Sequence, residues 1–303
     1  MLNTDFTPPM LDGVCASKLH LPPQSLVSVH TVFEYLCQEF PHIDPAEWQQ
    51  RFHDHLIYDA AGNQLQLNSP YQGNSHVFYY RFLAHEIEVP YEHQILHETD
   101  DLLVVDKPHF LTMSPTGQYV QQTLLVRLKK QTNNADLTPI HRLDRETAGV
   151  VLFSKRPQSR GLYQQLFAER QVKKIYHAIA GYRADLPFPQ TIKLRMQKGQ
   201  PFYTMQVVEG EANSETHIEL LEQHNGWAKY RLSPHTGKQH QLRVHLNHLN
   251  IPIQNDPLYP EVQHKAEDDF SCPLQLLAKE ISFPDPVTGQ IMHFYSNFEL
   301  TLK

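Results

Sequence analysis

Apolar and polar positions in the first ninety residues predict a small helical region. The first thirty residues contain several prolines and little periodicity, which indicates an extended arm. The segment TVFEYLCQEF at 31–40 then has a short helical pattern. A second helix is predicted after DPAE at 44–47, an acidic N-cap followed by proline, because Trp48, Phe52 and Leu56 recur every four residues.

A hairpin is predicted to complete this region. The segment DAAGNQ at 59–64 has the composition of a turn, and VFYYRFL at 77–83 has the residues of a strand. The linker EVPYEHQ at 88–94 follows. We therefore expect a small helix–helix–hairpin domain, with the N-terminal arm, over residues 1–90.

From about residue 93, strand patterns become more frequent than helical ones. Their segments are 95–108 (strand, turn, strand), 149–155, 173–181, 217–223 and 227–233. The last, WAKYRLS, alternates cleanly, with Ala228, Tyr230 and Leu232 on one face. Strands outnumber helices and do not alternate with them one for one, so we expect an α+β domain over 91–303 rather than a doubly wound sheet.

Two helices are predicted within this larger domain. One covers SRGLYQQLFAER at 159–170, where Leu162 and Leu166 lie one turn apart. The other is expected to begin at Thr236-Gly237, with Leu242, Leu246 and Leu249 as its buried stripe.

Charge is distributed unevenly along the chain. The net charge of the whole chain is −7. Residues 1–106 contain three lysines or arginines and fifteen aspartates or glutamates, whereas residues 141–250 contain sixteen and nine. A polyanion is the natural partner of the basic segment. A chance excess of basic residues on a solvated face is the alternative.

Several classes of protein lack support in the sequence. No apolar run approaches the length of a membrane span, and MLNTDFTPPMLDG does not have the pattern of a signal peptide. Cys15, Cys37 and Cys272 are isolated, so we expect a reducing, cytoplasmic location without a disulfide framework. The chain has no GxGxxG, GxxxxGK[ST] or GxSxG motif, so no nucleotide cofactor is expected.

The histidine-rich segment PHTGKQHQLRVHLNH raises the question of a metal site. His240 and His245 are five residues apart and do not share a helix face. His245 and His248 are three apart, but their helix has no carboxylate nearby. No metal site is therefore predicted.

The segment HRLDRETAG at 141–149 places Asp144 between two arginines, just before an apolar strand. A surface cluster of ion pairs explains this pattern. Taken by itself, the segment favours that interpretation, and a nucleophilic carboxylate beside an anion-binding site is the alternative.

Five blocks in order closely resemble the RluA-type pseudouridine synthases. They are DLLVVDKP at 101–108, HRLDRETAGVVLFSK at 141–155, KKIYHAIAG at 173–181, HTGKQHQLRVHLNHLNIPIQNDPLY at 235–259 and LLAKEISFPDPVTG at 276–289. The resemblance extends from about residue 93 to the C-terminus. It implies an α+β fold with a mixed, mostly antiparallel sheet, flanking helices and a central RNA-binding cleft.

The resemblance also implies an activity, the cofactor-free isomerisation of a uridine in RNA to pseudouridine. Asp144 matches the family's catalytic carboxylate, and whether it attacks the sugar or the base stays open. Arg243 matches the paired cation, and Tyr176 would stack on the uracil or handle a proton near it. As alternatives, Asp144 forms a structural ion pair and Tyr176 is a core residue.

Four further residues are expected to contact the RNA. By resemblance, Arg142 fills the gap left when the uridine leaves the stack, or else contacts a phosphate. Lys238, Gln239 and His240 are predicted at the start of a helix, where exposed N–H groups favour phosphate. An ordinary capped helix with a solvated lysine is the alternative.

The chain departs from the family pattern at several positions. Ala148 replaces a serine, Lys238 an arginine and Asn255 a glycine, and Leu277-Ala278-Lys279 replaces Leu-His-Ala. These changes bear on substrate choice, because the three catalytic candidates remain. The region 1–90 faintly resembles a small α-L RNA-binding domain, but Arg51 is its one lysine or arginine between residues 19 and 80. We therefore do not expect it to hold RNA tightly.

Three functions follow from these observations. The first is a cytoplasmic pseudouridine synthase that acts on a stem-loop of ribosomal or transfer RNA and is monomeric, as the family suggests. The second is a non-catalytic RNA-binding or remodelling protein with the same fold. The third is a hydrolase with an Asp–His arrangement, which no oxyanion-hole motif supports. The sequence does not identify the uridine.

Overall fold

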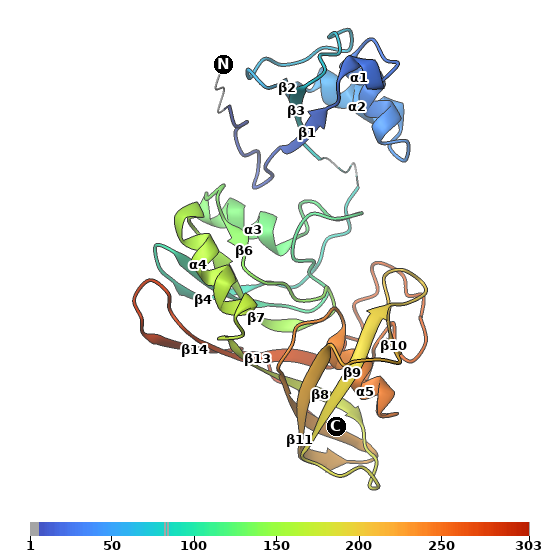
Figure 1. Cartoon of the computed structure of the whole chain (residues 1–303), viewed down its shortest axis with the longest axis vertical. Helices are drawn as coiled ribbons and strands as arrows, with labels where there is room; N and C mark the ends of the chain where they lie inside the picture. Colours follow the sequence, from blue (N-terminus) through green and yellow to red (C-terminus); the bar gives the residue numbers. More distant parts are fainter. Residues whose placement is uncertain (1–5, 82, 84, 303) are drawn as a thin grey trace. The chain divides into compact units, whose positions relative to one another are not determined.

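Two units make up the chain, each with its own β-sheet (Figure 1). The computed structural model describes residues 6–81, 83 and 85–302. The first unit comprises Met1–Glu86 and Val126–Ala135, and the second comprises Ile87–Leu125 and Asp136–Lys303. The segment Val126–Ala135, which lies within the predicted C-terminal domain, therefore belongs to the first unit.

The first unit contains a three-stranded antiparallel sheet and two α-helices. The strands pair in the order β1-β3-β2. The elements are β1 (Ser17–Leu21), the 3-10 helix η1 (Gln24–Leu26), α1 (Val32–Glu39), α2 (Pro45–His53), β2 (Ile57–Asp59) and β3 (Ser75–Tyr79). The first thirty residues are thus not simply an extended arm, because β1 pairs with β3 along its full length.

Local side-chain hydrogen bonds explain where the helices of this unit begin. Thr31 and Glu34 form a reciprocal capping box at α1, and the Asp44 carboxylate accepts from the Ala46 N–H at α2. Trp48 and Phe52 are buried as predicted. The helix α2 ends at His53, however, and His55, at φ 57°, separates it from Leu56. The predicted strand 77–83 ends at Tyr79, and Phe82 lies outside the described residues.

The second unit contains an eleven-stranded mixed sheet. Its order is β10-β9-β11-β12-β8-β13-β7-β5-β4, with β14 paired to β13 and β6 to β7. Its strands are β4 (Gln94–Glu98), β5 (Leu102–Lys107), β6 (Thr138–Pro139), β7 (Ala148–Ser154), β8 (Lys173–Gly181), β9 (Gln190–Lys198), β10 (Met205–Val208), β11 (Ser214–His224), β12 (Trp227–Pro234), β13 (Leu276–Pro284) and β14 (Ile291–Tyr295).

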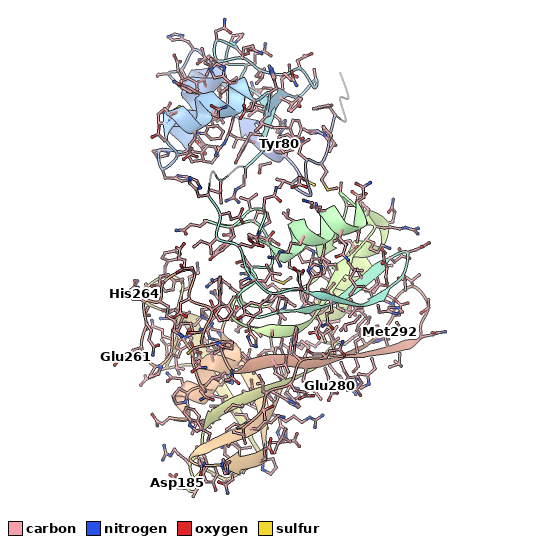
Figure 2. All side chains as sticks on the ribbon, turned by 180° about the vertical axis from the view of Figure 1, so that it is seen from behind. Tyr80, Asp185, Glu261, His264, Glu280 and Met292 are labelled. Atoms are coloured by element: carbon pink, nitrogen blue, oxygen red, sulfur yellow. The ribbon has the colours of Figure 1, made fainter. Side chains whose placement is uncertain are left out.

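Strand direction in this sheet confirms the predicted fold class. β13 and β7 run parallel, and the other strand pairs run antiparallel. Figure 2 labels Glu280 on β13 and Met292 on its antiparallel partner β14. Two helices belong to this unit, α4 (Pro157–Ala168) and α5 (Gln241–His248), whereas most of α3 (Leu124–Thr132) belongs to the first unit. No helix among the described residues is long and apolar enough to cross a membrane.

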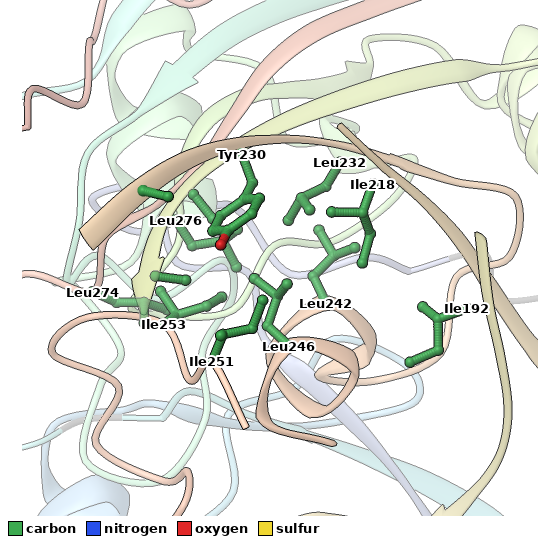
Figure 3. Close-up of a cluster of buried hydrophobic side chains, with 13 residues drawn as sticks. Ile192, Ile218, Tyr230, Leu232, Leu242, Leu246, Ile251, Ile253, Leu274 and Leu276 are labelled. Carbon is green, nitrogen blue, oxygen red and sulfur yellow. The ribbon is translucent and has the colours of Figure 1, made fainter. Parts of the chain in front are cut away.

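A hydrophobic core joins α5 to the middle of the sheet (Figure 3). Tyr230 and Leu232 on β12 are buried, which confirms the alternation predicted for this strand. Leu242 and Leu246 on α5 pack into the same cluster, and Leu249 lies against it, as the helix pattern predicts. This packing fixes α5, and with it the residues just before α5, against β8, β11 and β12.

Two helix predictions need correction. In α4, Leu166 is buried but Leu162 is 46% exposed, and Tyr163 takes the inner position, where its hydroxyl donates to Asp285 Oδ1 at 2.7 Å. The last helix begins at Gln241 rather than at Thr236-Gly237. The Gln241 carboxamide explains this start, since its oxygen accepts from both the Lys238 N–H and the Thr236 hydroxyl.

Candidate active site

A cavity of about 1400 Å³ in the second unit contains all seven residues singled out from the sequence. Its walls are the loop 141–147, the start of β8, the end of β12 and the loop that leads into α5. The candidate catalytic residues in its lining are Asp144, Tyr176 and Arg243. The candidate RNA contacts in its lining are Arg142, Lys238, Gln239 and His240.

Asp144 lies in the loop before β7 with 26% of its side chain exposed. Its Oδ2 is 3.5 Å from Arg243 Nη1 and 3.8 Å from His240 Nε2. Among the described residues, no ion pair joins Asp144 to either flanking arginine. The Arg142 side chain is exposed, and Arg145 Nη1 forms an ion pair with Glu146 at 2.8 Å. The cation beside Asp144 therefore comes from α5, about a hundred residues away in the sequence.

Arg243 is almost completely buried and is held by a second carboxylate. Its Nε donates to Asp256 Oδ2 at 2.8 Å and its Nη2 donates to Oδ1 at 2.6 Å, a bidentate pair. The remaining Nη1 is left to face Asp144. Burial works against the charge, but the hydrogen bonds and charge of Asp256, with the charge of Asp144, raise the pKa of Arg243.

Tyr176 lies on β8, between the core and the cavity. Its ring packs against the α5–β12 core, and the residue also lines the cavity. Burial, together with the negative charge of Asp144, raises the pKa of the Tyr176 phenol. The phenol is therefore neutral near pH 7, which suits stacking or proton donation and does not suit a base.

The three residues before α5 lie in a loop, not in the first helical turn as predicted. The Lys238 N–H is already bonded to the Gln241 side chain at 3.1 Å, and the Lys238 side chain is exposed. Gln239 is exposed and its amide reaches the Tyr203 carbonyl at 3.5 Å. The His240 side chain is only 7% exposed, and its backbone adopts a left-handed conformation. Their RNA contacts stay a prediction.

Cations dominate the wall of the cavity. Seven lysine and arginine side chains line it, against the two carboxylates Asp144 and Glu215. Arg231, Lys173 and Lys174 come from strands β12 and β8, so the positive charge surrounds Asp144 rather than forming a stripe on α5. A cavity with this balance attracts a polyanion.

Lys107, which was not singled out from the sequence, is hydrogen-bonded to the loop 141–147 that contains Asp144. It is fully buried at the end of β5 and donates to three carbonyl oxygens, those of Pro108, Leu111 and Arg145. Burial lowers the pKa of Lys107 to about 7, with the charges of Glu146 and Asp144 opposing the shift. The DKP sequence of the first matching block was the signal available for it.

Two of the histidines that raised the metal question, His240 and His245, are hydrogen-bonded to hydroxyl groups. His245 is buried, with Nε2 2.9 Å from the Ser214 hydroxyl, and burial lowers its pKa to about 4. Across residues 6–81, 83 and 85–302, no three histidine, cysteine or acidic side chains are grouped so that they could hold a metal ion.

A model of the family described as RNA pseudouridylate synthase matches residues 101–248. The chain is 28% identical over 242 residues to an uncharacterized RNA pseudouridine synthase of Synechocystis sp., across 75% of this chain and 79% of that protein. It is 30% identical over 213 residues to an uncharacterized RNA pseudouridine synthase of Mycoplasma pneumoniae, and the match covers 69% of this chain and 68% of that protein.

A third relative is the ribosomal large subunit pseudouridine synthase D of Neisseria meningitidis serogroup A. It is 32% identical over 216 residues, which cover 66% of this chain and 56% of that protein. Among solved structures, human RNA pseudouridylate synthase domain containing 1 aligns with a TM-score of 0.57 at 24% identity. That alignment covers 68% of this chain and 84% of the human chain, and it supports the fold.

Proposed function

Because the chain belongs to the RluA-type family of RNA pseudouridine synthases, which are isomerases, we propose that it converts a uridine in ribosomal or transfer RNA to pseudouridine, with Asp144 as the nucleophile. The observation that supports this most directly is the position of Asp144. It is partly exposed in a cation-lined cavity, with Arg243 at 3.5 Å.

The geometry suits a reaction that rearranges a substrate without a cofactor. The N-glycosidic bond between N1 and the sugar breaks, the uracil turns over, and a bond forms between C5 and the same sugar carbon. The C5 proton is released to water, and N1 takes up a proton, so that the product is an isomer of the substrate. Asp144 supplies the carboxylate for this exchange. The buried Asp256 occupies the other two donors of Arg243, so the guanidinium keeps one fixed orientation toward Asp144.

The uridine must leave its stack before Asp144 can reach the glycosidic bond, at a cost of about a few kcal/mol. In this proposal Arg142, which is exposed and lines the cavity two residues before Asp144, occupies the space that the base vacates. Tyr176, on β8, offers a neutral ring for stacking on the flipped uracil. Lys173, Lys174 and Lys238 supply positive charge for the phosphates.

Release of tritium from RNA labelled at uracil C5 tests the proposal. We expect the wild type to release label into water, because the C5–H bond breaks when pseudouridine forms. Asp144→Asn should release none and still bind RNA, since the substitution removes the nucleophile and preserves the shape of the side chain. Asp185→Asn, at an exposed aspartate paired with Arg183, is the matched control and should match the wild type.

Two results would contradict the proposal. A wild-type protein that binds RNA but releases no label from unmodified total RNA is a binding protein and not an isomerase. An Asp144→Asn variant that retains release would remove the nucleophile from the mechanism. Pseudouridine mapping in cells with and without the protein identifies the RNA, and the name of the meningococcal relative favours a large-subunit ribosomal site.

A further inference from the structure

The Tyr259 hydroxyl is hydrogen-bonded to His240, whose other ring nitrogen faces the candidate nucleophile. The Tyr259 hydroxyl accepts from the Met205 backbone N–H at 2.8 Å. The same hydroxyl lies 2.9 Å from His240 Nδ1. On the far side of its ring, His240 Nε2 lies 3.8 Å from Asp144 Oδ2.

The donors and acceptors of these contacts determine the tautomer of His240. The Tyr259 hydroxyl has one proton to donate, and its oxygen already accepts from Met205. Among the contacts of the Tyr259 hydroxyl in the described residues, His240 Nδ1 is the one that can accept the phenol proton. Burial raises the pKa of Tyr259 to about 12, so this proton is present near pH 7.

A neutral His240 with Nδ1 occupied as an acceptor carries its proton on Nε2. Burial is the largest influence on His240 and lowers its pKa, opposed by the charge of Asp144. The neutral ring is therefore the form that faces Asp144 near pH 7. Its Nε2 lies 3.8 Å from the same oxygen, Oδ2, that Arg243 Nη1 approaches at 3.5 Å.

Two donors thus converge on Oδ2, and no hydrogen bond or ion pair within residues 6–81, 83 and 85–302 involves Oδ1 of Asp144. We propose that His240 is a positioning residue, held by Tyr259 as the Nε2–H tautomer. Together with Arg243, it holds Oδ2 of Asp144, so that Oδ1 faces the uridine. The inference rests on the proposed function of Asp144. A movement of less than 1 Å brings the 3.8 Å contact within hydrogen-bond distance, as catalytic contacts often tighten on binding.

This role differs from the RNA contact predicted for His240 from the sequence. The side chain is only 7% exposed, so it offers little surface to a phosphate. The distinction is measurable, because a positioning residue acts on kcat, whereas an RNA contact acts on affinity.

Two substitutions at His240 separate the donor from the bulk of the ring. His240→Gln places an amide N–H close to the Nε2 position, and His240→Asn places its amide near Nδ1 and leaves Asp144 without the donor. We expect His240→Asn to lower kcat for tritium release roughly tenfold to hundredfold, the range for a hydrogen bond to a charged group. His240→Gln should retain kcat within about threefold, and RNA affinity should not change in either variant.

The tautomer is measured directly by two-bond ¹H–¹⁵N NMR of protein with ¹⁵N-labelled histidine, with His240 assigned by its loss in His240→Gln. We expect the Nε2–H pattern in the wild type. In Tyr259→Phe, which retains a ring beside Arg243 and removes the phenol proton, the pattern should shift toward a mixture of tautomers. This measurement needs neither RNA nor activity.

Three results would overturn the inference. One is an Nδ1–H pattern in the wild type, and another is equal kcat in His240→Asn and His240→Gln. The third is a loss of RNA affinity at unchanged kcat, which would make His240 an RNA contact. A wild-type protein that releases no tritium would instead contradict the proposed function, while the NMR result would still report on the Tyr259–His240 pair.

Discussion

At the scale of single residues, the site depends on the buried pair of Arg243 and Asp256. Both side chains are at most 2% exposed. Removing one partner of a buried ion pair leaves the other charge without compensation, which costs about 3–5 kcal/mol. We therefore expect Asp256→Asn to lower the free energy of unfolding by roughly this amount, measured by urea denaturation, and to lower kcat for tritium release.

An exposed carboxylate provides the control for this prediction. Asp185→Asn breaks the surface pair with Arg183 and should change the free energy of unfolding by less than about 1 kcal/mol. If Asp256→Asn were as mild as this control, Asp256 would not hold Arg243 in place.

The limits of sequence-based prediction are clearest for single side chains. Motifs brought Asp144, Tyr176 and Arg243 to attention, and the structure places all three in one cavity. The partner of Asp144 was harder to predict, because adjacency in the sequence favours Arg142 and Arg145, whereas the ion pair in the structure is with Arg243. Spacing along the chain does not specify side-chain direction in a loop. The bond between Tyr259 and His240 likewise depends on how α5 packs.

At the scale of secondary-structure elements, Gly149 near the start of β7 allows this strand to pack closely against β13. Its φ is +116°, and an added Cβ would lie 2.2 Å from the Ala278 carbonyl oxygen on the parallel strand β13. We expect Gly149→Ala to lower the free energy of unfolding by at least about 2 kcal/mol, because both the backbone angle and the close approach exclude a methyl group.

Gly161 on α4 is the matched control. An added Cβ there meets nothing within 4 Å, so Gly161→Ala should raise the free energy of unfolding by about 0.5–1 kcal/mol through better helix propensity. Both values come from thermal or urea denaturation followed by circular dichroism. Equal effects at the two glycines would show that the contact with β13 does not constrain β7.

Elements with a clear period were predicted best. β12 alternates strictly and α5 repeats its leucines, and both periods survive because one face of each element is buried. The strands β9 and β10 and the helix α3 were not predicted. β9 and β10 lie at one end of the sheet, where neighbouring strands, rather than a strong pattern of their own, define them. The start of α5 was placed too early, because the capping contacts of Gln241 depend on the tertiary structure.

At the scale of the whole molecule, basic side chains gather around the cavity of the second unit, whereas residues 19–80 of the first unit contain almost none. The one lysine or arginine between residues 19 and 80, Arg51, is 6% exposed and stacks 4.4 Å from the Trp48 ring. It stabilises the core of the first unit and offers almost no charge to a partner. The basic cavity lies entirely in the second unit. The charge asymmetry was evident from the sequence, whereas the membership of Val126–Ala135 in the first unit depends on contacts distant in sequence.

This charge distribution predicts how RNA affinity responds to salt. Each phosphate neutralised by a lysine or arginine releases bound counterions, so the logarithm of the affinity falls linearly with the logarithm of the salt concentration. We expect a steep slope for the wild type. Lys238→Gln, at an exposed lysine of the cavity wall, should make the slope shallower by about one unit. Fluorescence anisotropy of labelled RNA over a range of KCl concentrations measures both slopes.

Lys18→Gln in the first unit is the control, because Lys18 lies outside the cavity and contacts the ring of Phe78. Its slope should equal that of the wild type. A flat wild-type response would contradict an electrostatic RNA surface around Asp144. A shallower slope in Lys18→Gln, with none in Lys238→Gln, would move the RNA contacts to the first unit. Because the two substitutions remove the same charge, the comparison isolates where that charge lies.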